Sequence, residues 1–143
     1  MSKIFIGIDP DVDKSGVACW RQSDKKLFVF LLPFFGLYKQ LETISNNKQE
    51  AIVFIEAGWL NKKSNFHGRI GQSKNVGERI AKNVGANHET GRKIVEMCEY
   101  LNLPYELVVP KKAKTTPEYF KQLTKIETRN QEMIDASMLV FGR

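Results

Sequence analysis

The chain has few of the residues that mark disulfide-bonded, zinc-binding or membrane-spanning proteins. Among its 143 residues are only two cysteines and two histidines. Cys19 and Cys98 are far apart and form no CxxC motif, which argues against structural zinc and predicts a reducing, cytoplasmic location. The apolar run over residues 27–38 contains Pro33 and is too short to cross a bilayer. No signal peptide precedes the first expected strand, so we expect no membrane association.

Several familiar catalytic motifs are also missing. Ser15 and Ser137 have no histidine partner at motif spacing, and no phosphate-binding P-loop occurs. The spacing of Asp9, Asp11 and Asp13 is similar to that of a calcium loop, but the glycine and glutamate that such a loop requires are absent. The sequence therefore argues against serine hydrolases, P-loop enzymes and EF-hands.

Two acidic residues stand at the ends of predicted strands. Residues 3–9 are rich in β-branched and aromatic side chains and stop at Pro10, so Asp9 is expected at the end of a strand. The apolar run over residues 51–55 ends in the same way at Glu56. If these two strands are parallel neighbours, both carboxylates lie at the sheet edge where ligands bind in open α/β sheets.

Two further acids lie on a predicted C-terminal helix. We expect this helix from about residue 128 to about residue 141, with Thr128 as N-cap and Gln131 in capping-box position. Glu132 and Asp135 are three residues apart and so project from one helical face. The apolar surface expected to pack on the sheet consists of Met133, Ile134, Leu139 and Val140.

Carboxylates that crowd together repel one another unless a cation neutralises them. Carboxylate oxygens suit hard divalent ions, so the acids predict a Mg²⁺ site, with Mn²⁺ as a substitute. The predicted metal-binding and catalytic residues are Asp9, Glu56, Glu132 and Asp135.

The intervening segments predict a single α/β domain over residues 1–143. Strands are expected at residues 16–20 and 25–34, which complete an antiparallel meander with the first strand. A short helix over residues 37–47 leads into the strand that ends at Glu56.

Positive charge is concentrated after Glu56. The formal net charge is +6 and the pI is near 9.3. Residues 1–60 sum to zero, so residues 61–93 alone supply the whole excess. Such a stretch would hold a polyanion beside the metal site, with phosphate contacts giving affinity and not sequence preference, although it equally suits a solubilising surface. Its basic residues are Lys62, Lys63, Arg69, Lys74, Arg79, Lys82, Arg92 and Lys93.

Glycines are frequent in the same region, since six of the ten glycines of the chain lie between residues 58 and 91. We expect a mobile loop up to about residue 85 that orders on nucleic acid, followed by a helix over residues 87–101. His67 and His88 also lie here and are expected on the surface. The predicted buried stripe of the helix is Ile94, Met97, Cys98 and Leu101.

Taken together, these features resemble the RuvC-type Holliday junction resolvases of the RNase H-like superfamily. The resemblance covers essentially the whole chain. The motifs that carry it are Ile6-Gly7-Ile8-Asp9-Pro10, Ser15-Gly16, Phe54-Ile55-Glu56 and Glu132-x-x-Asp135-Ala136. Two positions depart from the family pattern: Glu132 stands where the family usually has Asp or His, and Asp11 where a Gly is common.

The resemblance implies a five-stranded mixed sheet, an antiparallel meander plus parallel strands, flanked by helices. It also implies two divalent ions held by the four acids, with Asp9 bridging both ions and Glu132 binding metal or orienting water. One ion would activate water and the other would stabilise the leaving 3′ oxygen. The implied activity is resolution of four-way DNA junctions by paired nicks.

The resemblance further implies how DNA is held. Trp59 would stack on a base at the junction centre. The expected fifth strand includes residues 107–109, and the basic residues that follow it would hold backbone phosphate. Lys121 would be a second basic position. The basic residues after that strand are Lys111, Lys112 and Lys114. The implied partners are branched DNA and a second copy of the chain, bound through the helix at residues 87–101, and a branch-migration helicase is a candidate third partner.

Two alternatives remain open. The same fold could serve a nuclease that acts on hybrids, flaps or RNA, or a catalytically silent nucleic-acid-binding module. A sugar-kinase or actin-like ATPase shares the first strand-turn-strand signature, but those proteins need two such domains and this chain is expected to hold one.

Overall fold

The computed structural model describes residues 3–61 and 74–143. Within these residues one sheet has the order β3-β2-β1-β4-β5. Strands β1 (Ile4–Asp9), β2 (Ser15–Arg21) and β3 (Lys26–Leu32) form the expected antiparallel meander. Strands β4 (Ala51–Glu56) and β5 (Tyr105–Val108) extend the sheet on the other side of β1, both parallel to it. The predicted mixed sheet is confirmed.

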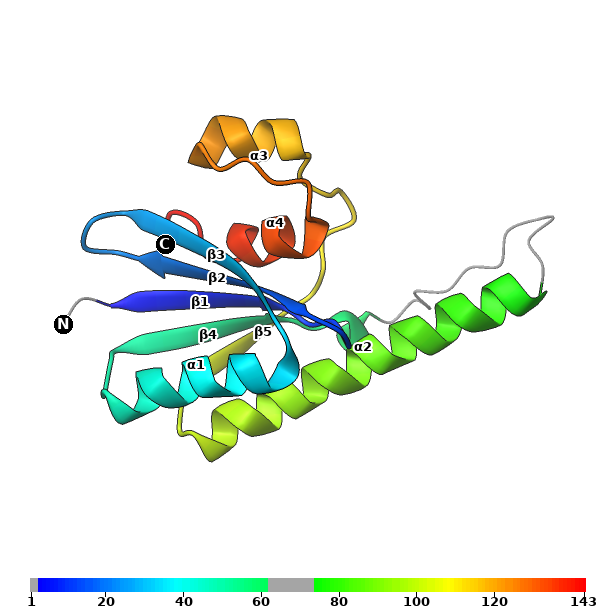
Figure 1. Ribbon diagram of the computed structural model, residues 1–143, viewed down its shortest axis with the longest axis horizontal. Helices are drawn as coiled ribbons and strands as arrows, with labels where there is room; N and C mark the ends of the chain where they lie inside the picture. Colours follow the sequence, from blue (N-terminus) through cyan, green and yellow to red (C-terminus); the bar gives the residue numbers. More distant parts are fainter. Residues whose placement is uncertain (1–2, 62–73) are drawn as a thin grey trace.

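Helices cover both faces of the sheet (Figure 1). On one face lie α1 (Phe34–Asn46) and α2 (Lys74–Tyr100), and on the other lie α3 (Pro117–Thr124) and α4 (Gln131–Met138). A single 3₁₀ turn, η1 (Gly58–Leu60), follows β4 directly. None of the helices in the described part of the chain is long and apolar enough to span a membrane.

Each face of the sheet has its own apolar core, because side chains alternate between the faces along every strand. The core under α1 and α2 contains the predicted helical stripe: Ile94, Met97, Cys98 and Leu101 are all buried there, as expected. The smaller core under α4 contains Phe5, Trp20, Phe54, Ala136 and Val140.

Two glycines allow α4 to approach the sheet closely. A Cβ added to Gly7 of β1 would collide with the carbonyl oxygen of Ala136, and one added to Gly16 of β2 would collide with that of Glu132. Glycine is required where backbone meets backbone in this way. These two close contacts hold α4 against β2 and against β1, the strand that ends at Asp9.

Strand β3 ends earlier than predicted and α1 starts earlier. The strand stops at Leu32 instead of residue 34, and the helix begins at Phe34 instead of residue 37. Pro33 explains both corrections, because it has no N–H to continue the ladder and it stands in an extended conformation at the N-cap of α1.

The start of α2 was predicted too late. The helix begins at Lys74, so residues 74–86 are helical and not part of a loop; residues 62–73 of the expected loop lie outside the described residues. Glycines were taken as loop markers, but one glycine inside a helix costs only about 0.5–1 kcal/mol relative to alanine. Gly85 and Gly91 are therefore tolerated within a helix of 27 residues.

The C-terminal helix is shorter than predicted and has a different cap. Helix α4 runs from Gln131 to Met138, and Asn130 is its N-cap, with Oδ1 accepting from Met133 N at 2.8 Å. Thr128 lies two residues before this cap, outside the helix, and its hydroxyl accepts from Asn130 N at 3.1 Å. The predicted capping box is wrong because a better cap, asparagine, lies two residues further on.

Helix α3 was not predicted, although its start signals are present in the sequence. Thr116 Oγ1 accepts from Tyr119 N at 3.1 Å, Pro117 occupies the first helical position, and Glu118 lies in the first turn. These are the residues that favour a helix N-terminus.

Candidate metal centre

Three of the four predicted acids meet at one edge of the sheet. Ile8 of β1 pairs with Ile55 of β4, so Asp9 and Glu56 are the next residues on two adjacent parallel strands. Asp135 reaches the same place from α4. One carboxylate oxygen from each of the three acids lies within 4.8 Å of the others.

Burial raises the pKa values of two of these carboxylates, Asp9 and Glu56. Burial raises the pKa of Asp9 from 3.8 to about 9, assisted by the charges of Glu56 and Asp135. Burial also raises the pKa of Glu56, with Lys114 opposing the shift and Asp135 adding to it. Negative charge at this edge is therefore poorly neutralised by the protein itself.

Lys114 brings a cation to the cluster. Its Nζ lies 3.0 Å from Asp135 Oδ2 and 3.4 Å from Glu56 Oε1. Burial lowers the pKa of the Lys114 ammonium, but the hydrogen bond to Asp135 and the charges of both acids outweigh this and leave the pKa raised. The ammonium is thus held in its charged form between two acids.

The geometry fits a divalent metal ion. Glu56 Oε2 is buried and has no hydrogen-bond partner among the described residues, which is costly for a carboxylate oxygen. A cation between Asp9, Glu56 and Asp135 would satisfy that oxygen, and an all-carboxylate set suits Mg²⁺ or Mn²⁺.

Glu132 stands apart from the group of three. It lies in the first turn of α4, one turn before Asp135, and its charge makes the smallest contribution to the raised pKa of Asp9. Helical spacing correctly placed Glu132 and Asp135 in one region. The rotation of α4 on the sheet makes Asp135 the one whose oxygen joins the cluster.

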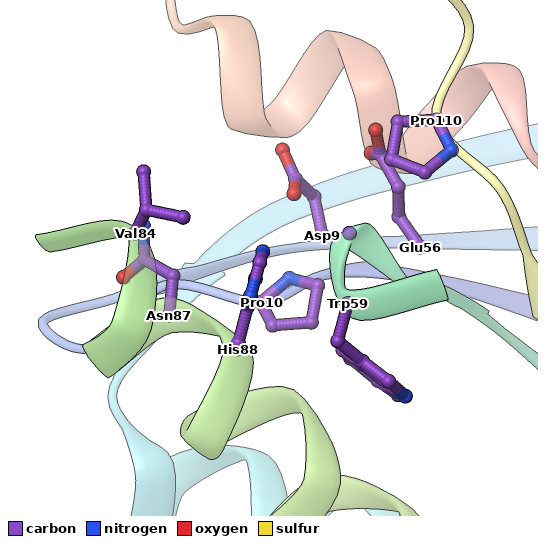
Figure 2. Close-up of a pocket in the computed structure, with 9 residues that line it drawn as sticks. Asp9, Pro10, Glu56, Trp59, Val84, Asn87, His88 and Pro110 are labelled. Atoms are coloured by element: carbon purple, nitrogen blue, oxygen red, sulfur yellow. The ribbon is translucent and has the colours of Figure 1, made fainter. Parts of the chain in front are cut away.

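A pocket of about 150 Å³ opens on the α2 side of the cluster (Figure 2). Its wall comes from the ends of β1 and β4, from η1 and from α2. In the figure, the carboxylates of Asp9 and Glu56 point to the same side, with Asn87 and His88 of α2 below and beside them. The lining residues are Asp9, Pro10, Glu56, Gly58, Trp59, Val84, Asn87, His88 and Pro110.

A smaller pocket of about 60 Å³ opens on the α4 side, so Glu56 forms part of both walls. Besides Glu56, the polar residues of this second pocket are Lys111, Lys114, Thr115 and Asp135. Gln131 connects two of them, because its Nε2 donates to Asp135 Oδ1 at 2.8 Å and to Thr115 O at 3.2 Å.

Trp59 forms a wall of the larger pocket and rests on α2. Gly91 leaves room for the indole, since a Cβ there would collide with the ring. The rings of Trp59 and His88 are 6.4 Å apart at 67°, and the Arg92 guanidinium lies 5.7 Å from the indole centroid. The predicted base-stacking role of Trp59 stays a prediction.

Sequence reasoning missed Asn87 and His88 as pocket residues. Asn87 Oδ1 accepts from Val12 N at 2.9 Å and so ties the loop after β1 to α2. Burial lowers the pKa of His88, and Arg92 lowers it further, which favours a neutral imidazole. Val84, Asn87, His88 and Gly91 follow helical spacing, a signal that was hidden while residues up to 85 were expected to form a loop.

The structure places the predicted basic residues that it describes in several separate parts of the molecule. Lys62, Lys63 and Arg69 lie outside the described residues, and Lys74 is the first residue of α2. Arg79 and Lys82 are exposed on α2, and Lys111 and Lys112 are exposed after β5. Lys121 lies on α3, 3.3 Å from Glu127. Lys114 differs from these other described residues, because its ammonium lies beside the carboxylates of Glu56 and Asp135.

Comparison with known proteins places this arrangement in a known fold. No protein-family model and no curated protein matches the chain. Among solved structures, T. thermophilus RuvC in complex with Holliday junction substrate matches with a TM-score of 0.55. The chain has the RNase H-like fold. The match covers 97% of this chain and 90% of RuvC at 11% sequence identity, so it establishes the fold, and activity must be argued from the site.

Proposed function

We propose that this protein is a metal-dependent endonuclease that resolves four-way DNA junctions. The observation that carries the proposal is the meeting of Asp9, Glu56 and Asp135 at the sheet edge, where a buried Glu56 oxygen has no hydrogen-bond partner in the part of the chain that the structure describes. Carboxylates from two strand ends and a helix are costly to hold together without a cation. The RuvC-like fold supports the choice of nucleic acid as substrate.

In this proposal Asp9, Glu56 and Asp135 hold two Mg²⁺ ions, for which Mn²⁺ can substitute. Bound metal would stabilise charge on the phosphoryl and leaving oxygens and lower the pKa of water at neutral pH. Gln131 fixes the orientation of Asp135 through its hydrogen bond. Glu132, one turn away on α4, is assigned to orient the attacking water or to complete the metal shell, as the resemblance implies.

The remaining residues would hold the DNA. Exposed Arg79 and Lys82 on α2 and exposed Lys111 and Lys112 after β5 are suited to contact phosphates, which give affinity without sequence preference. Trp59 at the pocket wall is assigned to stack on a base. We also propose a homodimer built through α2, which would present two equivalent metal centres to the two symmetric strands of a junction. A branch-migration helicase remains a candidate partner.

The test is cleavage of end-labelled four-way junction, linear duplex, single-stranded DNA and RNA/DNA hybrid, with Mg²⁺ or with EDTA. Symmetric nicks in the junction that require Mg²⁺ are the expected result. Asp9→Asn should lower the cleavage rate by more than roughly 100-fold, since even changes to residues behind metal ligands cost 10–100-fold. DNA binding should remain intact or tighten, because a repulsive charge is removed.

Asp13→Asn is the matched control. Asp13 is exposed in the loop after β1, and the substitution makes the same chemical change four residues from Asp9. It should cleave like the wild type. If the protein cuts a hybrid or a flap in a metal-dependent way and leaves the junction intact, the proposed nuclease activity stands but the proposed substrate is wrong. Tight junction binding without cutting by the wild type would favour the catalytically silent module.

A further inference from the structure

We propose that Lys114 is an internal counterion that a divalent metal ion must displace, so that this one side chain sets the metal affinity of the protein. The inference rests on the proposed metal-dependent function and adds to it a residue that competes with the ion. Its basis is the position of the Lys114 ammonium between two of the three clustered carboxylates.

The ammonium lies where cationic charge is needed. It is 3.0 Å from Asp135 Oδ2 and 3.4 Å from Glu56 Oε1, and its charge also acts on Asp9, where it opposes the effect of the two neighbouring acids. A metal ion that binds these carboxylates has to take up the same oxygens. Both cations cannot pair with Glu56 Oε1 and Asp135 Oδ2 in this way at once.

Lys114 is better placed to leave than the acids are. Its side chain is 48% exposed, against 9% for Glu56 and 12% for Asp135. The ammonium therefore approaches the cluster from the solvent side and can return to water with a small desolvation change, because long lysine side chains keep their head groups near solvent. The carboxylates stay in place.

The backbone beside Lys114 is held independently of the ammonium. Thr115 O accepts a hydrogen bond from Gln131 Nε2 at 3.2 Å, and the same Nε2 donates to Asp135 Oδ1 at 2.8 Å. Displacement of the ammonium thus leaves the chain next to Lys114 attached to α4. The exchange needs only rotation of one side chain, which then points its charge towards the mouth of the site.

A divalent ion is the stronger partner for this cluster. One ammonium donates hydrogen bonds to two acids, and the buried Glu56 Oε2 still has no hydrogen-bond partner within residues 3–61 and 74–143. A metal ion carries twice the charge and binds oxygens directly. The free energy needed to break the two Lys114 ion pairs reduces the net free energy of metal binding. By linkage, an anion that attracts the Lys114 ammonium, such as a DNA phosphate, must tighten metal binding.

The experiment measures Mn²⁺ affinity of the purified DNA-free protein by electron paramagnetic resonance of free Mn²⁺. Lys114→Met keeps an unbranched side chain one atom shorter and removes its charge. The variant should bind Mn²⁺ roughly tenfold more tightly than the wild type, as expected when a partly exposed, charge-assisted pair no longer competes. Lys114→Arg should restore wild-type affinity to within about threefold.

Lys93→Met is the matched control. Lys93 is 52% exposed and its Nζ lies 3.2 Å from Glu96, so the variant loses the same charge and a comparable ion pair on the surface of α2. Its Mn²⁺ affinity should equal that of the wild type. Equal tightening in both variants would show a general effect of net charge and would overturn the proposal.

Thermal melting separates competition from simple stabilisation. If Lys114 competes with the ion, Lys114→Met lowers the melting temperature in EDTA but not in saturating Mn²⁺, where the wild-type ammonium is already displaced. An equal loss in both conditions, or an unchanged Mn²⁺ affinity, would overturn the inference alone. If neither the wild type nor Lys114→Met shows Mn²⁺ binding that Asp9→Asn abolishes, the proposed function fails as well.

Discussion

The two helices that approach the acidic edge do so in different ways. Helix α4 meets the sheet through backbone, with its carbonyl oxygens over Gly7 and Gly16. Helix α2 meets the edge through side chains, with the Trp59 ring seated on Gly91 and Asn87 bonded to Val12 N. Backbone contacts leave little room for adjustment, whereas a side chain can change its rotamer.

The charges on the two sides differ as well. The α4 side supplies the third acid, Asp135, and lies beside the cation Lys114. The α2 side supplies His88, whose pKa is lowered by burial and by Arg92. The comparison indicates that α4 completes the cluster of three acids, the candidate metal centre, while α2 shapes the pocket that opens beside it.

The largest effect is expected from pH in the absence of metal. Burial raises the folded-state pKa of Asp9 to about 9, from an ordinary value of 3.8 that the unfolded chain retains. The stability that the neutral carboxyl contributes is therefore fully present below pH 3.8 and is lost as the pH rises towards 9. In EDTA the melting temperature should fall between about pH 5 and about pH 9.

Two controls assign that fall to the acidic cluster. Asp9→Asn should flatten the pH dependence, because the amide does not ionise. Mg²⁺ should stabilise the wild type more at high pH than at low pH, since a bound cation favours the ionised carboxylate. A pH dependence that is the same in the wild type and in Asp9→Asn would show that Asp9 is not held neutral by its surroundings.

The second effect is on the α4 side. Gly16→Ala should destabilise the protein by about 1–3 kcal/mol, because the new methyl group meets the Glu132 carbonyl and the backbone of α4 must move. Displacement of α4 should also weaken metal binding through Asp135. Urea unfolding and Mn²⁺ titration measure the two consequences.

Gly85→Ala is the matched control for this substitution. Nothing lies within 4 Å of a Cβ added at Gly85, and the residue is inside α2. Alanine there should be neutral or stabilising by up to about 1 kcal/mol. A Gly16→Ala protein as stable as the wild type would show that α4 does not need the close backbone contact.

The smallest effect is expected on the α2 side. Gly91→Ala places a methyl group against the Trp59 ring, which can move away, and alanine gains helix propensity, so the net loss should be about 1 kcal/mol or less. Indole fluorescence in a Trp20→Phe background should report the displaced ring, while Mn²⁺ affinity stays unchanged. Lost Mn²⁺ affinity would show that α2 also positions the metal centre.

Much of the acidic cluster followed from short sequence patterns. Apolar runs that end in Asp9 and Glu56 predicted two strand ends, and the pairing of Ile8 with Ile55 confirmed that these ends are adjacent. The pattern works because strands buried on both faces are read as continuous apolar runs. The spacing of Glu132 and Asp135 likewise predicted a shared helical region.

The parts that could not be predicted depend on how elements are placed against one another. The rotation of α4 on Gly7 and Gly16 makes Asp135 part of the group of three, and helical spacing alone does not define that rotation. The position of Lys114 depends on the path of the chain after β5. His88 was expected on the surface because it is isolated in the basic stretch of the sequence, whereas the structure places it in the lining of the larger pocket.

By itself, the sequence determined the ends of β1 and β4, the buried stripe of α2 and the acidic character of the site, since these depend on local order and side-chain chemistry. Only the tertiary structure decided which acids meet, that Lys114 lies between two of them, and that His88 faces the pocket. Those outcomes depend on packing between segments far apart in the chain, where differences of an ångström decide which atoms touch.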